Sequence, residues 1–447
     1  MAIRTDSLTV RGSGVVQEGI LLRRYQESID YLYGLQKYGI KFGLNRTESL
    51  LERLGNPHQR LRCVHVAGTN GKGSTAATLA AIMKEQGYRV GLYTSPHLVR
   101  FTERFRIDEQ EVKPERILDI FNQVHSILDE REPPTFFEVV TAMGLLYFEQ
   151  EQVDWAIVEV GMGGRLDATN VIHPRICVIT SISFDHQDFL GATLTSIARE
   201  KAGIIKEAVP VVCGARQPAV QSVIKATCFR RHAALYRLGV DFRARQHPDG
   251  SFHYQGLRHN WSGLRLNLDG AHQLSNASLA LATMEALNMQ DEVDVEQAAV
   301  SRGLLKVHWP ARLEILQENP LIVLDGAHNP QGAECLRDAL KHSFSYRRLH
   351  LVLGVMKDKD LRGIMRRLLP IADTVIFTRP RYERGADPEY LKALASPYLQ
   401  NHYVVPEVAA ALQQARLLAQ PDDLICITGS LYFAGEVKEL FGEPTTF

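Results

Sequence analysis

The sequence predicts an α/β protein of two domains, each built on a mostly parallel, doubly wound sheet. Short, nearly continuous apolar runs, such as residues 155–160 and 176–181, are typical of strands buried on both faces. Segments with helical spacing alternate with these runs, which is the order expected of βαβ units. The 447-residue chain is also too long for one ordinary hydrophobic core.

Residues 1–305 are predicted to form the N-terminal domain. Apolar residues recur at helical spacing between positions 20 and 55, with an interruption at Gly39, Gly43 and Asn45. Strands are expected at 61–66, 89–93, 155–160, 176–181 and 209–213, and helices at 74–86, 115–128 and 139–149. The polar stretch 229–268 contains a turn at Pro248, which favours a small antiparallel β excursion. A helical pair follows, from 272 to about 303.

The α/β pattern restarts after a linker at 306–311, which contains Trp309 and Pro310. Residues 312–447 are predicted to form a Rossmann-like domain. Its expected strands are 321–324, 349–353, 374–378 and 424–428, and its expected helices are 330–341, 360–368, 388–394 and 407–418.

The amino-acid composition limits the kinds of protein that this chain can be. Lys plus Arg and Asp plus Glu both number 51, so the chain is not predicted to bind nucleic acid or a membrane surface through general charge. The six cysteines form no C-x-x-C pair, which indicates reduced thiols rather than a disulfide framework or a zinc ribbon. The start of the chain lacks an apolar signal region, and no apolar run is long enough to span a membrane. A soluble cytoplasmic enzyme is therefore expected.

A glycine-rich loop between the first strand and the next helix predicts a site for ATP phosphates. Lys72 would place its charge on the β- and γ-phosphates, and the following helix N-terminus favours an anion. The pattern departs from G-x-x-x-x-G-K-[ST], because Val66 occupies the first glycine position and Gly73 separates Lys72 from Ser74. A glycine-rich turn without a ligand is disfavoured by the strand before it, the helix after it and the lysine. The predicted ATP-binding residues of this loop are Gly68, Thr69, Asn70, Gly71, Lys72, Gly73 and Ser74.

Further motifs follow in order along nearly the whole chain. They are YTSPH (93–97), VRFTER (99–104), TFFE (135–138), EVGMGGRLDATN (159–170), FDH (184–186), EKAG (200–203), PARL (310–313), DGAHNP (325–330), KDKD (357–360) and TGS (428–430). Together with the loop GTNGKGS, this ordered set resembles the Mur-ligase superfamily, and within it the family of folylpolyglutamate and dihydrofolate synthases.

The resemblance implies a reaction. Members of this family use ATP to phosphorylate a carboxylate of a pteroate or folate, and the amine of L-glutamate then attacks the acyl phosphate. Such chemistry requires mainly positioning and charge neutralisation. The implied partners are small molecules only: ATP as a substrate, L-glutamate, and dihydropteroate or folates. Two Mg²⁺ ions and an additional K⁺ are the implied cofactors, and the implied state is a monomer. Both synthase activities are expected.

Magnesium and catalytic residues are also implied by the resemblance. Ser95, Glu159 and His186 match the metal ligands, although softness alone would make His186 a structural or titrating residue. Lys201 matches a carbamylated lysine, whereas a Glu-Lys pair taken alone is usually a solvated surface charge. Lys72, Lys201 and His328 are the implied catalytic residues.

The same resemblance distributes the remaining contacts over both domains. The residues implied to contact nucleotide outside the loop are Asn276, Arg312 and Asp325. The residues implied to contact glutamate are Asp325, His328, Ser430 and Tyr432. The residues implied to contact the pterin are Thr135, Phe136, Arg165 and Ala168, and the loop 42–45 is expected to cover that side. An interdomain salt bridge for Arg312 and core packing for Phe136 are the alternatives that need no ligand.

Two other functions compete with a folate ligase. A peptidoglycan amino-acid ligase of the same superfamily would carry an additional N-terminal nucleotide-sugar domain, and only 67 residues precede the loop here. A nucleotide-binding regulator would hydrolyse ATP slowly and need no amine acceptor. The strand-end motif at 325–330 in the second domain argues against such a regulator.

Overall fold

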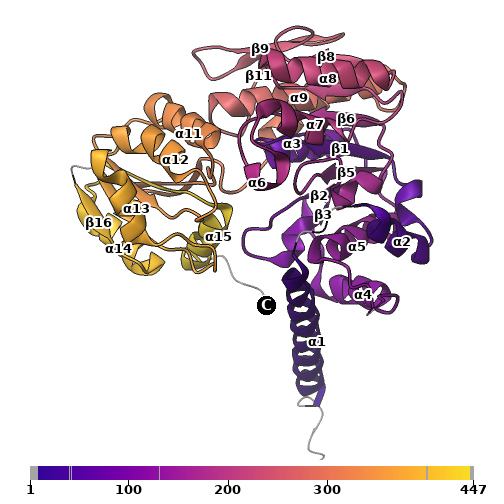
Figure 1. Ribbon diagram of the computed structural model, residues 1–447, viewed down its shortest axis with the longest axis horizontal. Helices are drawn as coiled ribbons and strands as arrows, with labels where there is room; N and C mark the ends of the chain where they lie inside the picture. The colour runs from indigo at the N-terminus through magenta and orange to yellow at the C-terminus, as the bar shows by residue number, and fades with distance from the viewer. Residues whose placement is uncertain (1–8, 40, 42, 130, 399–400, 443–447) are drawn as a thin grey trace, which may run out of the picture.

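The computed structural model describes residues 9–39, 41, 43–129, 131–398 and 401–442 (Figure 1). Two α/β units lie side by side, and helix α1 (Thr9–Gly34) projects from the N-terminal unit. The predicted fold class is confirmed in both units. Among the described residues, no helix combines the length and the apolar character needed to cross a membrane.

The N-terminal unit is built on an eight-stranded sheet in which six consecutive strands are parallel. Its order is β4 (Gln110–Glu111), β3 (Phe105–Ile107), β2 (Val90–Tyr93), β5 (Trp155–Glu159), β1 (Cys63–Ala67), β6 (Ile176–Ile179), β7 (Val211–Cys213) and β8 (Leu235–Arg237). The antiparallel edge strands β3 and β4 are too short to leave an apolar pattern and were not predicted. Strand β8 was expected in the antiparallel excursion, but it pairs in parallel with β7.

Helices cover both faces of this sheet because alternate strand residues point to opposite sides. Val64 and Val66 of β1 pack into the same core as α3 (Lys72–Glu85), α9 (Ala271–Asn288) and α10 (Gln297–Lys306). Cys63 points the other way, into the core that includes α5. The helices of that second face are α4 (Pro114–His125), α5 (Phe136–Gln150), α7 (Leu194–Ala202) and α8 (Pro218–Arg230).

Helix α1 begins at Thr9, earlier than the sequence pattern predicted. Its last part carries buried apolar residues, such as Tyr25, Ile29 and Leu32, and these pack against α4 and α5. The residues before position 20 have no apolar periodicity, so the helix start left no signal. The other short helices of the N-terminal unit are η1 (Leu35–Tyr38), α2 (Asn45–Arg53), η2 (Pro57–Arg60), η3 (Phe101–Arg104), η4 (Ala168–Val171) and α6 (Gln187–Leu190).

The predicted antiparallel excursion is a separate three-stranded sheet of β9 (Arg243–Gln246), β10 (Phe252–Gln255) and β11 (Asn260–Leu264). The buried carboxylate of Glu285 on α9 holds it in place. Glu285 accepts hydrogen bonds from the Tyr254 hydroxyl at 2.7 Å and from the His259 backbone N–H at 2.7 Å. It also accepts from the backbone N–H groups of Leu257 and Arg258. The excursion is thereby fixed to a helix that also lines the site.

The C-terminal unit has a six-stranded sheet that is parallel except for β12. Its order is β12 (Glu314–Glu318), β13 (Leu321–Asp325), β17 (Leu424–Thr428), β14 (Leu349–Leu353), β15 (Thr374–Phe377) and β16 (His402–Val404). One face carries α11 (Pro330–His342), α12 (Leu361–Leu368) and α13 (Pro388–Ala395), and the other carries α14 (Val408–Leu418) and α15 (Leu431–Leu440). Short η5 (Leu369–Ile371) and η6 (Ser396–Tyr398) follow α12 and α13.

The predicted apolar strands of this unit are confirmed, whereas β12, β16 and α15 were missed. Strands β12 and β16 lie at the sheet edges and are only partly buried, so their sequences lack continuous apolar runs. We propose residues 306–311 as the linker between domains 1–305 and 312–447, because α10 ends at Lys306 and β12 begins at Glu314.

Replacing Glu285 should weaken the whole N-terminal domain. Glu285→Gln puts an amide N–H group among donors that need an acceptor, and unsatisfied buried groups cost about 1–3 kcal/mol each. We expect a loss of about 3 kcal/mol in the free energy of unfolding, measured by urea denaturation. Tyr254→Phe removes a single hydrogen bond and should cost about 1 kcal/mol. Equal stability of Glu285→Gln and the unmodified protein would contradict this account.

Candidate functional site

A cavity of about 960 Å³ lies between the two units and is lined by residues of both. The carboxyl ends of parallel strands supply much of its wall, as expected for sheets of this type. The N-terminal unit contributes the glycine-rich loop after β1 and Glu159 at the end of β5. The C-terminal unit contributes Asp325 at the end of β13 and Ser430 just after β17.

The glycine-rich loop is tightly packed. Gly71 precedes α3 with φ +87°, a backbone conformation that favours glycine, and a Cβ there would lie 2.3 Å from Asn276 Oδ1. A Cβ at Gly73 would lie 2.8 Å from Trp309 Nε1. The extra glycine after Lys72 therefore makes room for the linker tryptophan. Ser74 Oγ is buried and has no hydrogen-bond partner, which leaves it free to bind a ligand.

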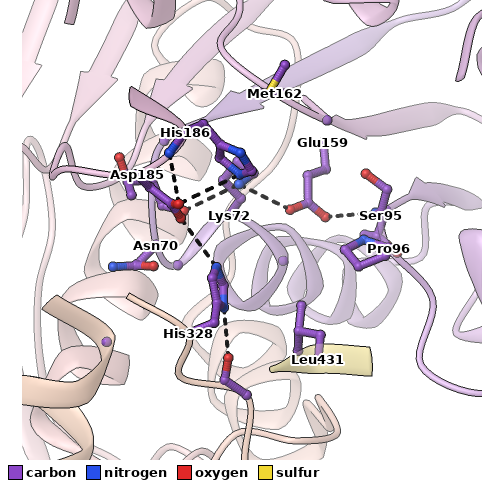
Figure 2. Close-up of a pocket in the computed structure, with 18 of the residues that line it drawn as sticks. Asn70, Lys72, Ser95, Pro96, Glu159, Met162, Asp185, His186, His328 and Leu431 are labelled. Carbon is purple, nitrogen blue, oxygen red and sulfur yellow. Dashed lines mark hydrogen bonds and ion pairs between the residues drawn. The ribbon is translucent and has the colours of Figure 1, made fainter. Parts of the chain in front are cut away.

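Lys72 faces the carboxylate of Glu159 across the cavity floor, with 3.9 Å between Nζ and Oε1 (Figure 2). The backbone N–H of Ser95 donates to Glu159 Oε2 at 3.3 Å. Burial raises the pKa of Glu159, while Lys72 and the Ser95 hydrogen bond oppose that shift. A buried carboxylate that shares a wall with a lysine suits binding of a cation and a phosphate side by side.

Among the described residues, no cluster of three or more His, Cys, Asp or Glu side chains has metal-ligand geometry. The predicted ligands Ser95, Glu159 and His186 nevertheless line one cavity, together with the unpartnered hydroxyl of Ser74. Hydroxyl and carboxylate oxygens suit a hard cation such as Mg²⁺, which completes its shell with phosphate oxygens and water. Partial burial and the charges of Lys359 and Lys72 lower the pKa of His186 to about 4, so its imidazole is neutral at pH 7. The residues present therefore fit magnesium bound together with a nucleotide.

Lys201 is buried in the domain rather than solvated, so the surface-charge alternative is wrong. Its side chain is 4% exposed, and Nζ donates to the Gly68 carbonyl at 2.8 Å. Burial, reinforced by Lys72, lowers the pKa of the Lys201 amine to about 7. About half of these amines are neutral, and therefore nucleophilic, at pH 7.

Asp185 connects the two units and was not predicted as a site residue. It follows β6, and its carboxylate accepts from Lys359 Nζ at 2.6 Å and from Asn329 Nδ2 at 3.1 Å. His328 Nε2 lies 3.4 Å away (Figure 2). Burial alone would raise the pKa of Asp185, but His328, Lys359 and His186 hold it well below its usual range. A single carboxylate thus joins the N-terminal unit to two segments of the C-terminal unit.

An amide pair next to this ion pair ties the glycine-rich loop to the C-terminal unit. Asn70 Nδ2 donates to Asn329 Oδ1 at 3.0 Å, and Asn329 Nδ2 donates to Asn70 Oδ1 at 2.8 Å. Asn70 also donates to Gln331 Oε1 at 2.9 Å. Asn329 caps α11 through the Gly332 N–H, so the loop is linked directly to the start of a helix.

The segment around Arg312 is held by Asp325. Asp325 accepts from the backbone N–H of Leu313 at 3.0 Å and from that of Ala327 at 2.9 Å. Ala311 and Leu313 both have positive φ, 55° and 51°, which is uncommon for residues with a Cβ. This segment directs Arg312 into the cavity near Glu159, and the other predicted nucleotide contact, Asn276, lies against the loop at Gly71 in the same cavity.

The predicted pterin residues do not all reach the cavity. Thr135, Phe136 and Ala168 line it, whereas Arg165 does not and forms an ion pair with Glu200 at 2.9 Å. Thr135 is also the N-cap of α5 and forms a capping box with Glu138. Two residues of the TFFE motif therefore have a structural role at the start of this helix. Phe136 is stacked on Tyr33 at 5.6 Å. Of the predicted covering loop, Phe42 lies outside the described residues, while its neighbours Lys41 and Gly43 line the cavity.

The predicted glutamate-side residues lie on the C-terminal wall. His328 Nδ1 donates to the Gly326 carbonyl at 2.9 Å, which directs Nε2 toward Asp185. Ser430 caps α15 by accepting from the Tyr432 backbone N–H at 3.1 Å. The Tyr432 ring is stacked on Tyr382 at 4.2 Å.

Several cavity residues were missed even though most belong to motifs already quoted. Arg104 is only 6% exposed, and Arg104 Nε donates to His97 Nδ1 at 2.8 Å. Among the described residues, no carboxylate lies within ion-pair distance of Arg104. Its motif, VRFTER, shows an arginine but not its burial. Asp185 and Lys359 lie in FDH and KDKD, and their polar character at strand ends was the available signal.

Comparison with known proteins agrees with this geometry. Residues 66–284 match the Mur ligase middle domain, and residues 311–431 match the Mur ligase glutamate ligase domain. A Bacillus subtilis protein named dihydrofolate synthase/folylpolyglutamate synthase is 37% identical over 426 residues, which cover 93% of this chain and 98% of that protein.

The chain belongs to the folylpolyglutamate and dihydrofolate synthase family of Mur ligases. The structure of Mycobacterium tuberculosis folylpolyglutamate synthase complexed with ADP has a TM-score of 0.89 at 36% identity, covering 94% of this chain and 99% of that one. An Escherichia coli enzyme in complex with DHPP and ADP has a TM-score of 0.86 at 34% identity, covering 92% and 97%. The predicted family, fold class and ATP-dependent ligase class are confirmed.

Removing the charge of Asp185 should open the two units of this ligase. Breaking a buried ion pair by loss of one partner costs about 3–5 kcal/mol, and Asp185→Asn leaves Lys359 without its carboxylate. We expect a larger radius of gyration in small-angle X-ray scattering of the nucleotide-free protein, and Lys359→Met should act in the same direction. Asp188→Asn, an exposed carboxylate three residues along the chain, is the matched control. Scattering of Asp185→Asn identical to that of the control would refute the bridge.

Proposed function

We propose that this protein is an ATP-dependent ligase that adds L-glutamate to dihydropteroate and to reduced folates through an acyl phosphate. The observation that carries the proposal is the single cavity in which a phosphate-type loop and a buried carboxylate face the strand ends of a second domain. The names of similar proteins, which combine dihydrofolate and folylpolyglutamate synthase, support both activities.

The first half of the reaction is activation of the acceptor. A carboxylate is a poor electrophile, so transfer of the γ-phosphoryl group supplies a leaving group. Lys72, the loop N–H groups, Asn276 and Arg312 would bind ATP and neutralise its phosphates. Ser74, Ser95, Glu159 and His186 would hold Mg²⁺, which supplies further charge neutralisation when bound. K⁺ remains a proposed additional cation.

The second half is attack by the amine of glutamate. Asp325, His328, Ser430 and Tyr432 lie on the C-terminal wall, so an amino acid held there faces the loop only when the two units are together. We assign His328 to orient the amine. Arg104 is a buried cation with no carboxylate partner among the described residues. It therefore favours the binding of an anionic substrate in this cavity.

The acceptor would lie beside the N-terminal wall. Phe136 lines the cavity and would offer an aromatic ring to a flat heterocycle, with Tyr33 stacked on it as support. Thr135 and Ala168 also line the cavity. Arg165 is proposed only as an indirect support through Glu200, since it does not line the cavity. Asp167, a buried cavity residue that the sequence did not single out, holds the adjoining turn by accepting from the Met162 N–H at 2.8 Å.

We also propose the cellular compartment, the oligomeric state and the binding partners. All six cysteines are free and five of them are buried, which fits a reducing cytoplasm. Because the cavity is completed by residues of one chain, we propose a monomer that binds small molecules only. A peptidoglycan ligase would instead depend on a UDP-sugar acceptor, and a regulator would show no stimulation by glutamate.

Phosphate release tests the proposed reaction directly. We expect release from ATP to require L-glutamate together with either dihydropteroate or tetrahydrofolate, with each product one glutamate longer by mass spectrometry. Lys72→Ala should lower turnover by at least about a thousandfold, because it removes a charge that stabilises the transferred phosphoryl group, while circular dichroism stays unchanged. Release that depends on a UDP-sugar, or that ignores glutamate, would reject the proposal in favour of the corresponding alternative.

Lys201 should be carbamylated, and modification should increase as the pH rises through about 7. Only the neutral amine reacts with carbon dioxide, and burial lowers the amine pKa to about 7 from an ordinary value of 10.5. Labelled bicarbonate should give a carbamate ¹³C resonance that Lys201→Ala lacks and that the exposed control Lys225→Ala retains. Lys201→Ala should lose Mg²⁺-dependent turnover and regain part of it with added acetate or formate. Full activity of Lys201→Ala would remove this residue from the mechanism.

A further inference from the structure

Arg384 is a second arginine in the cavity, contributed by the C-terminal unit after β15, and neither the sequence motifs nor the mechanism above includes it. Its guanidinium lies 5.3 Å from the centre of the Tyr382 ring and 5.9 Å from that of Tyr432. The two rings are stacked on each other with an interplanar angle of 14°. Stacking on aromatic faces fixes the plane of an arginine and leaves its N–H groups directed outward.

The ion pair with its acidic partner leaves most N–H donors of Arg384 available. Arg384 Nη1 lies 3.3 Å from Asp358 Oδ2, and the two side chains are 42% and 33% exposed. An ion pair this exposed stabilises by only about 0–1 kcal/mol. A guanidinium has five N–H donors, so most remain available for a carboxylate that enters the cavity.

Arg104 approaches the same tyrosine from the N-terminal wall. Burial raises the pKa of Tyr432, whereas the charges of Arg384 and Arg104 both lower it. Arg104 is bonded to His97, in the segment just after Ser95, which itself bonds Glu159. Arg104 therefore belongs to the N-terminal wall beside the reacting groups, whereas Arg384 belongs to the C-terminal wall and lies against the rings of Tyr382 and Tyr432.

Glutamate carries two anionic groups at different distances from its amine. The α-carboxylate is one carbon away and must stay beside the reacting centre. The side-chain carboxylate lies two carbons further out, and it alone distinguishes glutamate from neutral amino acids. A second cation in the cavity, on the other wall from Arg104, suits this second group.

We propose that Arg384 binds the side-chain carboxylate of the incoming amino acid and thereby selects glutamate. The inference rests on the proposed ligase activity and adds a specificity-determining residue to it. Tyr382 acts as a positioning residue because its ring holds the guanidinium, and Tyr432 adds to this support beside the amino acid. The charged, planar group matters, so lysine is an incomplete substitute.

Steady-state kinetics of Arg384→Gln and Arg384→Lys test the assignment, with ATP and Mg²⁺ saturating and dihydropteroate as acceptor. Arg384→Gln should raise KM for glutamate by about ten- to a hundredfold, the range for one lost charged hydrogen-bonding partner. The kcat should change little, because the interaction is made equally before and during the reaction. The KM of Arg384→Lys for glutamate should lie between that of the unmodified protein and that of Arg384→Gln. Thermal unfolding should confirm that both variants fold.

Selectivity supplies the sharper measurement. Glutamine is used as a competing inhibitor, since it keeps the α-carboxylate and loses the side-chain charge. The ratio of the inhibition constant of glutamine to the KM for glutamate should fall by the same factor by which the KM for glutamate rises. Equal weakening of glutamate and glutamine would assign Arg384 to the α-carboxylate and overturn the proposal, as would an unchanged KM for glutamate.

Arg381→Gln is the matched control. It lies on the same segment, but its side chain is 68% exposed, pairs with Glu436 and Glu439, and does not line the cavity. Its KM for glutamate should equal that of the unmodified protein.

A comparison of two acceptors tests the remaining possibility, which is that Arg384 binds the acceptor rather than the incoming glutamate. Dihydropteroate has no glutamate tail, whereas tetrahydrofolate has one. If Arg384→Gln raised KM for tetrahydrofolate alone, Arg384 would bind the tail of the acceptor and the proposal would be overturned. Failure of the ligase function itself is distinguishable, because the unmodified protein would then show no glutamate-dependent phosphate release.

Discussion

The carboxylate of Asp185 is the buried charge through which the two units contact each other. It lies at the end of a strand of the N-terminal sheet and contacts Lys359, Asn329 and His328 of the C-terminal unit. Its chain neighbour His186 lines the same cavity. A buried charge is tolerated only with partners, so these contacts favour one relative position of the units. The cavity has its shape because that position is fixed.

The glycine-rich loop shows how packing and chemistry share the same residues. Gly71 leaves room for Asn276 and Gly73 for Trp309, so the loop accepts side chains from α9 and from the linker. Asn70 pairs with Asn329 across the units. A loop of this kind is held from several directions before any ligand arrives, which reduces the ordering cost of binding. Gly73, which separates Lys72 from Ser74 and departs from the commoner pattern, is therefore a steric requirement.

Local pattern was sufficient for the buried strands, because an apolar run such as Ile176–Ile179 has few alternatives inside a doubly covered sheet. It was insufficient for edge strands such as His402–Val404, which is mostly exposed and pairs with a single neighbouring strand. Site residues followed the same division. Lys72 and Glu159 carry their signal in the chain, whereas Asp185 and Arg384 acquire their partners only when distant segments meet. Arg165 shows the reverse case, in which a matching motif position faces Glu200 rather than the cavity.

The hydrogen bond from Lys201 to the Gly68 carbonyl has a consequence for the proposed modification. A carbamate retains one N–H on the former amine nitrogen and gains a carboxylate beyond it. The retained N–H is enough to keep the bond to Gly68, so the loop backbone can stay in place while the side chain changes from a base to an anion. One residue would then reverse the sign of the local field next to the phosphates without moving the scaffold that holds them.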